Sequence, residues 1–406
     1  MIANDINISS TKIKYGLDRT YQFLELCNNP QKKISSVQII GTNGKGTVAT
    51  MLSNILKDCG YKVGTFTSPH LVNINERISI NNKQIDDKDI HHFLNSYYNR
   101  ANSIEPSFFE LMTVMAMWYF HREKVDIAIL ETGLGGRLDS VTACENSILV
   151  FTSISMDHHH ILGNSLKKIA SEKAQAIIST FQHCISFNQG ESINAILQKH
   201  AQKCKTGLDF IDTTNNIFNL KYLHGNHQEL NGHLAKAAAI KILKRDNVNI
   251  NIKKIISRIN NTSWHGRFQI IQKTPTVIYD VAHNNESLLS FIDCFNRFKD
   301  LKTYNKKYLI VAFEDNKKIK TVLRRYEKHF NFIICTQTNI RSSMPSKKIR
   351  SIFSKQDHIS YNNDLYNSII NTLSKLKSND IVAIIGSHFI APTIQKIFEN
   401  CFAQKS

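Results

Sequence analysis

The sequence predicts an α/β protein of two domains, in which a parallel-sheet domain precedes a smaller, doubly wound, Rossmann-like domain. Three observations predict this fold. The chain has 406 residues, which is longer than a chain that folds around a single hydrophobic core usually is. Short apolar segments alternate with helix-length segments, as in parallel sheets with crossover helices. After Pro275 the alternation restarts, and we place the domains at residues 1–273 and 274–406.

The first unit of this alternation is a strand, a glycine-rich loop and a helix. Val37–Ile40 is a short apolar strand, the segment GTNGKGT follows it, and an apolar-periodic stretch runs on to Leu56. Glycines let backbone N–H groups approach phosphate oxygens, and the N-terminus of the following helix adds a favourable dipole. Although the spacing differs from the common GxxxxGK[ST] motif, the strand and helix that this motif requires are both present.

The segment therefore predicts a phosphate-binding loop (P-loop) in a parallel-sheet ATPase domain. Lys45 would neutralise the β- and γ-phosphates, and Thr47 would ligate Mg²⁺. The residues predicted to bind ATP here are Gly41, Thr42, Asn43, Gly44, Lys45, Gly46 and Thr47.

The remaining elements follow from apolar runs and apolar spacing. In the first domain we expect strands at 63–66, 125–130 and 148–153, and helices at 109–120, 165–178 and 234–243. The polar stretch 182–226 is expected to be less regular. In the second domain we expect strands at 277–279, 308–313, 332–335 and 381–385.

Polar residues follow two of the predicted strands of the first domain. Glu131 ends one strand, and a segment with Asp157 and three consecutive histidines, His158–His160, follows another. Ligands of open α/β sheets bind beyond the carboxyl ends of the strands, so Glu131 is placed to hold a metal ion. Consecutive residues point in different directions, so the three histidines favour one metal ligand with two neighbours over a zinc site.

Composition narrows the class of protein. Lys and Arg exceed Asp and Glu by 51 to 33, which makes nucleic-acid binding an alternative, but the lysines are spread along the chain and no basic stripe is apparent. No apolar stretch suits a secretory signal or a membrane span. The eight cysteines form no CxxC pair or regular framework, which favours reduced thiols in the cytoplasm.

Eight segments, in this order along the chain, resemble the signature of bacterial folylpolyglutamate synthases, many of which are also dihydrofolate synthases, within the Mur ligase superfamily. The segments are GTNGKGT at 41–47, TSPHLVNINERI at 67–78, FFE at 108–110, ETGLGGRLD at 131–139, SMDHHHILG at 155–163, SEKA at 171–174, GRFQ at 266–269 and DVAHN at 280–284.

The resemblance implies roles for individual residues. It implies that Ser68, Glu131 and His158 join Thr47 as Mg²⁺ ligands and that Lys173 is carbamylated, which would turn a cation into an oxygen ligand. It implies that Asn231, Arg267 and Asp280 join the ATP site, with Arg267 facing the charge of the transferring phosphoryl group. The catalytic residues expected on this basis are Lys45, His158, Lys173 and Arg267.

The resemblance also implies a site for the pterin-bearing substrate. Its expected residues are Leu17, Asp18, Arg19, Ser107, Phe108, Phe109, Glu110, Leu138, Asp139 and Ser140. Asp18 stands where the family often has glycine, and Ser107 replaces a common threonine. Gln175 follows the SEKA segment where the family usually has glycine.

We therefore expect a cytoplasmic, monomeric ligase that uses ATP and Mg²⁺ to join L-glutamate to dihydropteroate and to reduced folates through an acyl phosphate. No nucleic-acid or membrane partner is expected. One alternative is an enzyme that only extends folate polyglutamates. A P-loop kinase or ATPase that does not ligate, and a basic nucleic-acid-binding protein that uses ATP as a switch, are further alternatives.

Overall fold

A computed structural model describes residues 16–101, 103–178, 183–215, 217–298, 301–315, 317–340 and 342–403. The polar start of the chain, Met1–Lys14, lies outside these ranges. The chain divides into two compact units: residues 1–220 with 227–262, and residues 221–226 with 263–406. The division after residue 262 comes earlier than the predicted boundary after residue 273, which falls within a pair of hydrogen-bonded strands of the second unit.

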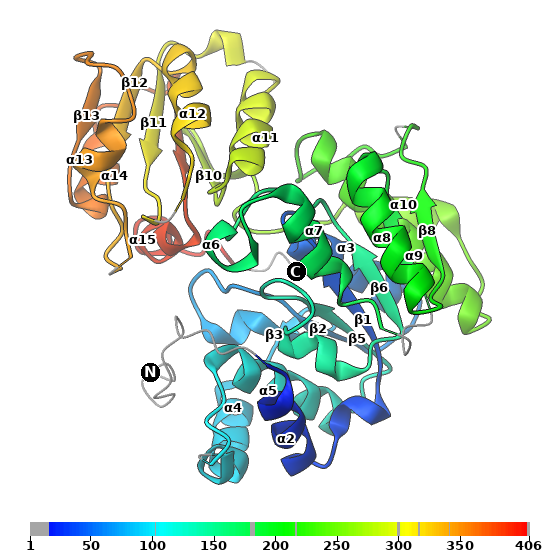
Figure 1. The fold of residues 1–406 in the computed structure, drawn as a ribbon. Coiled ribbons are helices and arrows are strands. Elements are labelled where there is room, and N and C mark those ends of the chain that lie inside the picture. The colour runs from blue at the N-terminus through cyan, green and yellow to red at the C-terminus, as the bar shows by residue number, and fades with distance from the viewer. Residues whose placement is uncertain are drawn as a thin grey trace. The chain divides into compact units, whose positions relative to one another are not determined.

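The first unit is built on an eight-stranded sheet with the order β4-β3-β2-β5-β1-β6-β7-β8 (Figure 1). Six strands run parallel, whereas β3 and β4 form an antiparallel edge. The strands are β1 (Ser35–Ile40), β2 (Val63–Phe66), β3 (Ile78–Ile80), β4 (Lys83–Gln84), β5 (Ile127–Glu131), β6 (Ile148–Phe151), β7 (His183–Phe187) and β8 (Leu208–Ile211).

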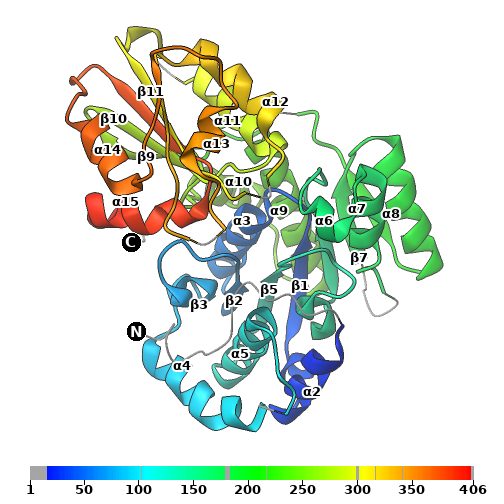
Figure 2. The same cartoon turned by 60° about the vertical axis from the view of Figure 1, so that its left-hand side comes forward.

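Helices cover both faces of this sheet (Figure 2). Right-handed crossovers that run in opposite directions place their helices on opposite faces, as for α3 between β1 and β2 and α5 between β2 and β5. The α-helices are α2 (Asp18–Leu26), α3 (Lys45–Asp58), α4 (Asp87–Phe93), α5 (Phe108–Arg122), α6 (His159–Leu162), α7 (Leu166–Ala174), α8 (Glu191–Lys203), α9 (Asn226–Arg245) and α10 (Ile252–Asn260).

Helix α5 shows how the sequence determines one of these elements. Ser107 caps the helix by accepting a hydrogen bond from the backbone N–H of Glu110, and the Glu110 carboxylate accepts one from the N–H of Ser107. This capping box satisfies two donors that a helix start leaves free. The helix is apolar on most sides, and its residues from Leu111 to Met117 are buried in one hydrophobic core together with Ala128 and Leu130 of β5.

The second unit contains a six-stranded sheet with the order β13-β12-β11-β14-β10-β9. All pairs are parallel except the edge pair of β9 and β10. The strands are β9 (Gln269–Lys273), β10 (Thr276–Asp280), β11 (Lys307–Val311), β12 (Phe332–Cys335), β13 (Ile359–Tyr361) and β14 (Ile381–Ile385). The α-helices are α11 (Asn285–Asn296), α12 (Lys320–Leu323), α13 (Ser346–Arg350), α14 (Leu365–Leu373) and α15 (Ala391–Ile397).

The predicted fold class is confirmed: a P-loop domain with a mainly parallel sheet precedes a smaller doubly wound domain. The prediction for residues 182–226 was wrong. Apart from residues 182 and 216, which lie outside the described ranges, this stretch contains β7, α8 and β8 as a further strand–helix–strand unit. Its edge strand β8 is only partly buried, so it lacks the apolar run that marks a central strand.

Candidate functional site

The central strands of the first sheet end together at one edge. In the register of the sheet, Ile39 of β1 pairs with Glu131 of β5, and Ile40 pairs with Phe151 of β6. Phe66 of β2 pairs with Leu130. The segments that follow these four strands therefore start side by side, at the edge where open α/β sheets bind ligands.

The glycine loop between β1 and α3 is closed by its neighbours. A Cβ atom on Gly41 would overlap the side chain of Thr152, and one on Gly44 would overlap the Asn231 amide. Gly44 also has φ +87°, in the left-handed region that glycine tolerates best. Asn231, predicted to bind ATP, is thus packed directly against the P-loop, although α9 carries it.

Two predicted lysines meet at this loop. The Lys45 Nζ donates hydrogen bonds to the carbonyl oxygens of Gly41 (3.3 Å) and Thr42 (3.0 Å). The Lys173 Nζ donates to the carbonyl oxygens of Gly41 (2.7 Å) and Gly135 (3.4 Å), and its side chain is buried. Burial, together with the nearby Lys45 charge, lowers the pKa of Lys173 to about 7.

Thr47 and Glu131 supply oxygen atoms of the kind that Mg²⁺ prefers. Thr47 is buried, and its Oγ1 has no hydrogen-bond partner among the described residues. A buried hydroxyl without a partner is costly, and a metal ion would satisfy it. The buried Glu131 carboxylate accepts a hydrogen bond from the backbone N–H of Ser68 (3.0 Å), which places two further predicted ligands together.

In the described part of the chain, no three His, Cys, Asp or Glu side chains form a metal cluster by themselves. Mg²⁺ usually binds through one or two carboxylates together with substrate phosphates and water. The hydroxyl of Thr47 and the carboxylate of Glu131 fit that pattern, so the residues present suit a metal ion that arrives with a nucleotide.

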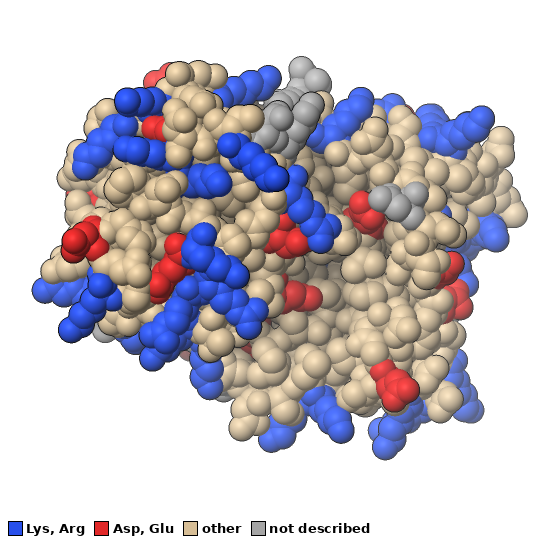
Figure 3. All heavy atoms as spheres, turned by 90° about the horizontal axis from the view of Figure 1, so that it is seen from above, with Lys and Arg blue, Asp and Glu red and all other residues tan. Residues whose placement is uncertain are grey.

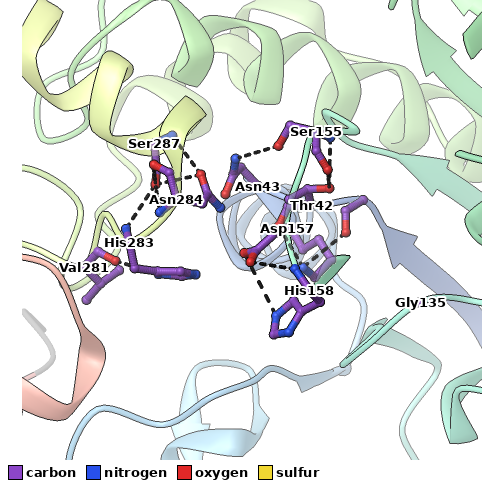
Figure 4. A network of polar contacts seen from close by, with 12 residues as sticks. Thr42, Asn43, Gly135, Ser155, Asp157, His158, Val281, His283, Asn284 and Ser287 are labelled. Atoms are coloured by element: carbon purple, nitrogen blue, oxygen red, sulfur yellow. Dashed lines mark hydrogen bonds and ion pairs between the residues drawn. The ribbon is translucent and has the colours of Figure 1, made fainter. Parts of the chain in front are cut away.

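The segment after β6 is fastened to the P-loop (Figure 4). The Thr42 hydroxyl donates to the Ser155 carbonyl oxygen (3.1 Å) and accepts from the Ser155 N–H (3.0 Å). His158 follows at φ +47°, with its backbone N–H donating to the Asp157 carboxylate (2.8 Å). The predicted ligand His158 is therefore carried by a segment that the P-loop itself holds.

Three residues of the predicted pterin site lie together at the start of α5. Arg19 of α2 forms a two-point ion pair with Glu110, at 3.3 Å from Nε to Oε2 and 3.1 Å from Nη2 to Oε1. Glu110 is also engaged by Ser107 in the capping box. The Phe108 and Phe109 rings are half-buried, and Phe109 packs on Gly133. Leu17 is half-buried beside the same core, whereas Asp18 is exposed at the start of α2.

The predicted residues Leu138, Asp139 and Ser140 lie in the loop after β5. Both carboxylate oxygens of the buried Asp139 accept hydrogen bonds from this loop, one from the N–H of Leu134 (2.8 Å) and one from that of Val141 (3.0 Å). The Ser140 hydroxyl contacts that of Thr113 on α5 at 2.6 Å. Asp139 thus shapes the loop, and Ser140 attaches it to α5, while Leu138 is half-buried.

The second unit carries the other two predicted ATP-binding residues. Asp280 ends β10, and its carboxylate accepts hydrogen bonds from the N–H groups of Phe268 and Ala282, both at 2.7 Å. Arg267 is close enough for its charge to act on Asp280. Beyond Asp280, the side chains of Asn284 and Ser287 cap α11 (Figure 4). Within its own unit, this group lies at the carboxyl end of a parallel strand.

Reasoning from the sequence missed two kinds of residue at the first-unit site. Arg77 is a buried cation whose Nε donates to the His70 Nδ1 (2.8 Å), although it sits in a polar segment that gave no sign of burial. Gln38, in the centre of β1, is fully buried and donates to the hydroxyls of Thr132 (3.0 Å) and Thr142 (2.9 Å). A polar residue inside an apolar strand was the available signal for Gln38.

The surface charge bears on the nucleic-acid alternative. On the face in Figure 3, Lys and Arg side chains are most frequent on the left, where uncharged and acidic side chains lie between them, and they are sparse over a broad uncharged area in the centre and on the right. A nucleic-acid footprint is expected as a patch or stripe, so this face does not single out one binding groove. In the ranges that the structure describes, no helix has both the length and the apolar character that crossing a membrane requires.

Comparison with known families and proteins gives a consistent result. Residues 39–255 match the Mur ligase middle domain, and residues 266–388 match the Mur ligase glutamate ligase domain. A dihydrofolate synthase/folylpolyglutamate synthase of Bacillus subtilis is 30% identical, with 95% of each chain covered. A protein of the same description from Buchnera aphidicola (subsp. Schizaphis graminum) is 29% identical, with 88% of this chain and 86% of the relative covered.

Solved structures share the fold over nearly the whole chain. The folylpolyglutamate synthase of Mycobacterium tuberculosis, complexed with ADP, has a TM-score of 0.86 at 22% identity, covering 98% of this chain and 96% of that one. The Escherichia coli FolC in complex with DHPP and ADP has a TM-score of 0.84 at 24% identity, with the same coverage. At such identities the likeness concerns the fold.

Proposed function

The chain belongs to the Mur ligase family and, within it, to the dihydrofolate synthases/folylpolyglutamate synthases, and from this premise we propose how its residues join glutamate to a folate. It is an ATP-dependent acid–amino-acid ligase. The acceptors are dihydropteroate, which yields dihydrofolate, and reduced folates, which gain a glutamyl residue. The single observation that carries the proposal is the convergence of Lys45 and Lys173 on the carbonyl oxygen of Gly41, at the edge where Glu131 ends β5.

The first step that we propose activates the acceptor. A carboxylate oxygen of the acceptor attacks the γ-phosphorus of ATP, the bond from this phosphorus to the β–γ bridging oxygen breaks, and ADP leaves. The N–H groups of the glycine loop hold the phosphates, Lys45 turns from the loop carbonyls to the phosphate oxygens, and Asn231 keeps the loop in place. We propose Arg267 as a further source of positive charge for the transferring phosphoryl group.

Mg²⁺, when bound, offsets the charge on the phosphates and on the transferring group. We propose that the ligands from this chain are Thr47, Ser68, Glu131, His158 and Lys173. The Oγ1 of Thr47, which lacks a partner in the described part of the chain, and the contact between Glu131 and Ser68 support these three members of the set.

We further propose that Lys173 acts as a carbamate. Its neutral amine would attack CO₂, form a C–N bond and release one proton, leaving an anionic oxygen ligand on a side chain whose positive charge burial disfavours. Burial of the side chain supports this step, because it lowers the pKa of the amine to about 7 and leaves much of it neutral at physiological pH. A carbamate nitrogen keeps one N–H, which is enough for the bond to Gly41.

In the second step, the amine of L-glutamate attacks the acyl carbon, the bond from this carbon to the phosphate oxygen breaks, and phosphate leaves. The proton of the attacking amine passes to solvent. Half-buried Phe108 and Phe109 would line the acceptor site, and the ion pair of Arg19 with Glu110 would fix the start of α5 beside it. We also propose a monomer, and a location in the cytoplasm, where the eight cysteines would stay free.

Product analysis tests the proposed function and separates its alternatives. Purified protein with Mg²⁺ and ATP is given dihydropteroate or tetrahydrofolate, with and without glutamate, and products are identified by mass. The expected result is a gain of one glutamyl unit on both acceptors, with stoichiometric ADP, only when glutamate is present. A gain of a glutamyl unit on tetrahydrofolate but not on dihydropteroate would indicate a chain-extending enzyme. ADP release without need of glutamate would favour the kinase or ATPase.

A further inference from the structure

Arg77 is a buried cation that the proposed mechanism does not yet use. It ends a short 3₁₀ turn, Ile74–Arg77, in the segment between β2 and β3. The segment is fixed by Glu76, whose carboxylate accepts hydrogen bonds from the N–H groups of Leu71 (2.7 Å), Val72 (2.9 Å) and Asn73 (2.7 Å). Arg77 is 8% exposed, so its position is set by a rigid loop and not by a mobile surface segment.

The contacts of Arg77 leave four of its five N–H donors without a hydrogen bond to a described residue. Its Nε donates to the His70 Nδ1, and its guanidinium lies 5.2 Å from the centroid of the Phe108 ring. Among the described residues, no carboxylate lies within ion-pair distance of Arg77, and neither Nη atom has a protein hydrogen-bond partner. A buried guanidinium normally has its charge and its donors satisfied, so these Nη atoms are available to an anion.

Arg122 shows what a purely structural arginine looks like in the same unit. Its guanidinium lies 4.6 Å from the Trp118 ring, and its Nη2 is also paired with Asp89 (2.8 Å) and with Glu123 (3.1 Å). Both arginines therefore lie on an aromatic ring, but only Arg122 has carboxylate partners from the protein. The difference indicates that the missing partner of Arg77 comes from a ligand.

The surroundings of Arg77 identify the kind of anion. Phe108, which we propose as a wall of the acceptor site, lies against the guanidinium. Glu131 at the edge of the sheet and Glu76 in the same segment are near enough for their charges to act on Arg77, without pairing directly with it. An anion held here would lie between the aromatic part of an acceptor and the phosphates of ATP. A carboxylate attached to an aromatic ring fits both neighbours, and the planar guanidinium binds carboxylates through two parallel N–H groups.

We propose that the Nη atoms of Arg77 bind the acceptor carboxylate that is about to be phosphorylated. The inference rests on the proposed function and names a residue for the acceptor within it. A positive charge is needed at this point because two anions, the carboxylate and the triphosphate, must approach each other. His70 acts as a positioning residue, because its bond to Nε orients the guanidinium.

A binding comparison tests the proposal. Dissociation constants for pteroate and for its carboxamide, which lacks the negative charge, are measured in the presence of ADP and Mg²⁺ for the wild type, Arg77→Met and Arg77→Lys. The wild type should bind the acid more tightly than the amide. In Arg77→Met this preference should fall roughly 10- to 100-fold, the range of hydrogen bonds to a charged group, while amide binding stays unchanged. Arg77→Lys keeps the charge but loses the two parallel N–H groups, so its preference for the acid should lie between those of the wild type and Arg77→Met.

Arg122→Met is the matched control, and it should retain the acid preference of the wild type even if its stability falls. Equal loss of acid and amide binding in Arg77→Met would overturn the proposal, since it would show only damage to the site wall. An unchanged preference in Arg77→Met, or no preference in the wild type, would overturn it as well. Should Arg77→Met not fold, an unaltered preference in Arg77→Lys has the same meaning. Glutamate-dependent ADP formation by the wild type, measured in parallel, reports separately on the proposed function.

Discussion

The Nζ atom of Lys173 donates a hydrogen bond of 2.7 Å to the carbonyl oxygen of Gly41, across 132 positions of the sequence. This contact connects α7 to the first residue of the P-loop. It brings the buried Lys173 close enough to Lys45 for the two charges to interact, at the proposed site of the ATP phosphates. Two neighbouring cations would help bind a nucleotide, whereas a lysine converted to a carbamate would help bind its metal ion.

Lys173→Ala should therefore slow ligation strongly while leaving the P-loop able to bind ADP. Loss of a group that supports a metal site usually costs roughly 10- to 100-fold in activity. The check is the rate of glutamate-dependent ADP formation, together with nuclear magnetic resonance of the wild type equilibrated with ¹³C-labelled bicarbonate. A carbamate resonance should appear in the wild type and be missing from Lys173→Ala. A fully active wild type without that resonance would contradict the carbamate.

Gly44→Ala should weaken nucleotide binding, because a Cβ at this position overlaps the Asn231 side chain and the φ of +87° disfavours alanine. Gly60→Ala provides the control. Gly60 has a similar φ of +95°, but nothing lies within 4 Å of its Cβ position. Both variants should lose stability by about 1 kcal/mol from backbone strain. Only Gly44→Ala should lose ADP affinity in calorimetric titrations, and equal losses in the two variants would count against the role of this contact.

Thr47→Val should separate metal binding from stability. Because the buried Oγ1 has no hydrogen-bond partner among the residues that the structure describes, its replacement by a methyl group should leave the unfolding temperature unchanged or raise it. The Mg²⁺-dependent part of ADP affinity should fall, roughly tenfold or more, whereas Thr47→Ser should keep it. The measurement is ADP titration with and without Mg²⁺ for the three proteins. If Thr47→Val binds ADP and Mg²⁺ as the wild type does, Thr47 is not a ligand.

The pH dependence of stability should reveal the buried Asp139. Burial raises its pKa from 3.8 to about 6 in the folded chain, so the folded state holds this proton more tightly than the unfolded state does. Its contribution to stability is full below pH 3.8 and is lost as the pH rises through 6. Between pH 5 and pH 7 the wild type should lose about 1 kcal/mol relative to Asp139→Asn.

Urea unfolding of both proteins across this pH range measures the effect. Asp58→Asn is a useful control, because the bond to Arg258 lowers the pKa of Asp58. The stability that Asp58 adds is then lost only at pH values below 3.8, and it should be constant between pH 5 and pH 7. A difference between wild type and Asp139→Asn that stays constant, or grows with pH, would show that Asp139 is not held with a raised pKa.

Much of the fold could be predicted from the sequence because its central strands are buried on both faces. Strand β14 is a continuous apolar run, β5 is apolar up to Glu131, and β1 is apolar over Val37–Ile40 except for Gln38. Such runs followed by glycine or acidic residues mark the strand ends of parallel sheets. The P-loop was predictable for a different reason. The backbone geometry at Gly44 excludes other side chains, so the glycine itself marks the loop in the sequence.

Two kinds of feature could not be predicted from the sequence: strands with weak patterns, and side chains whose burial or hydrogen bonds depend on the folded structure. The edge strands β4 and β8, and β3 beside β4, are short or partly exposed and carry no strong pattern. Arg77 looks like any charged residue of a polar loop, and only the packing of Phe108 over its guanidinium reveals that it is buried. Asp139 could be placed near the site, but the use of both its oxygens by the backbone of its own loop required the structure.

The central claim, ligation through an acyl phosphate, is tested most directly with an acceptor whose carboxylate carries ¹⁸O. If the carboxylate attacks the γ-phosphorus, one labelled oxygen must leave with the phosphate when glutamate replaces it. We predict one ¹⁸O atom in each phosphate released, for both dihydropteroate and tetrahydrofolate, and none when glutamate is omitted. Unlabelled phosphate released together with a glutamylated product would contradict the account.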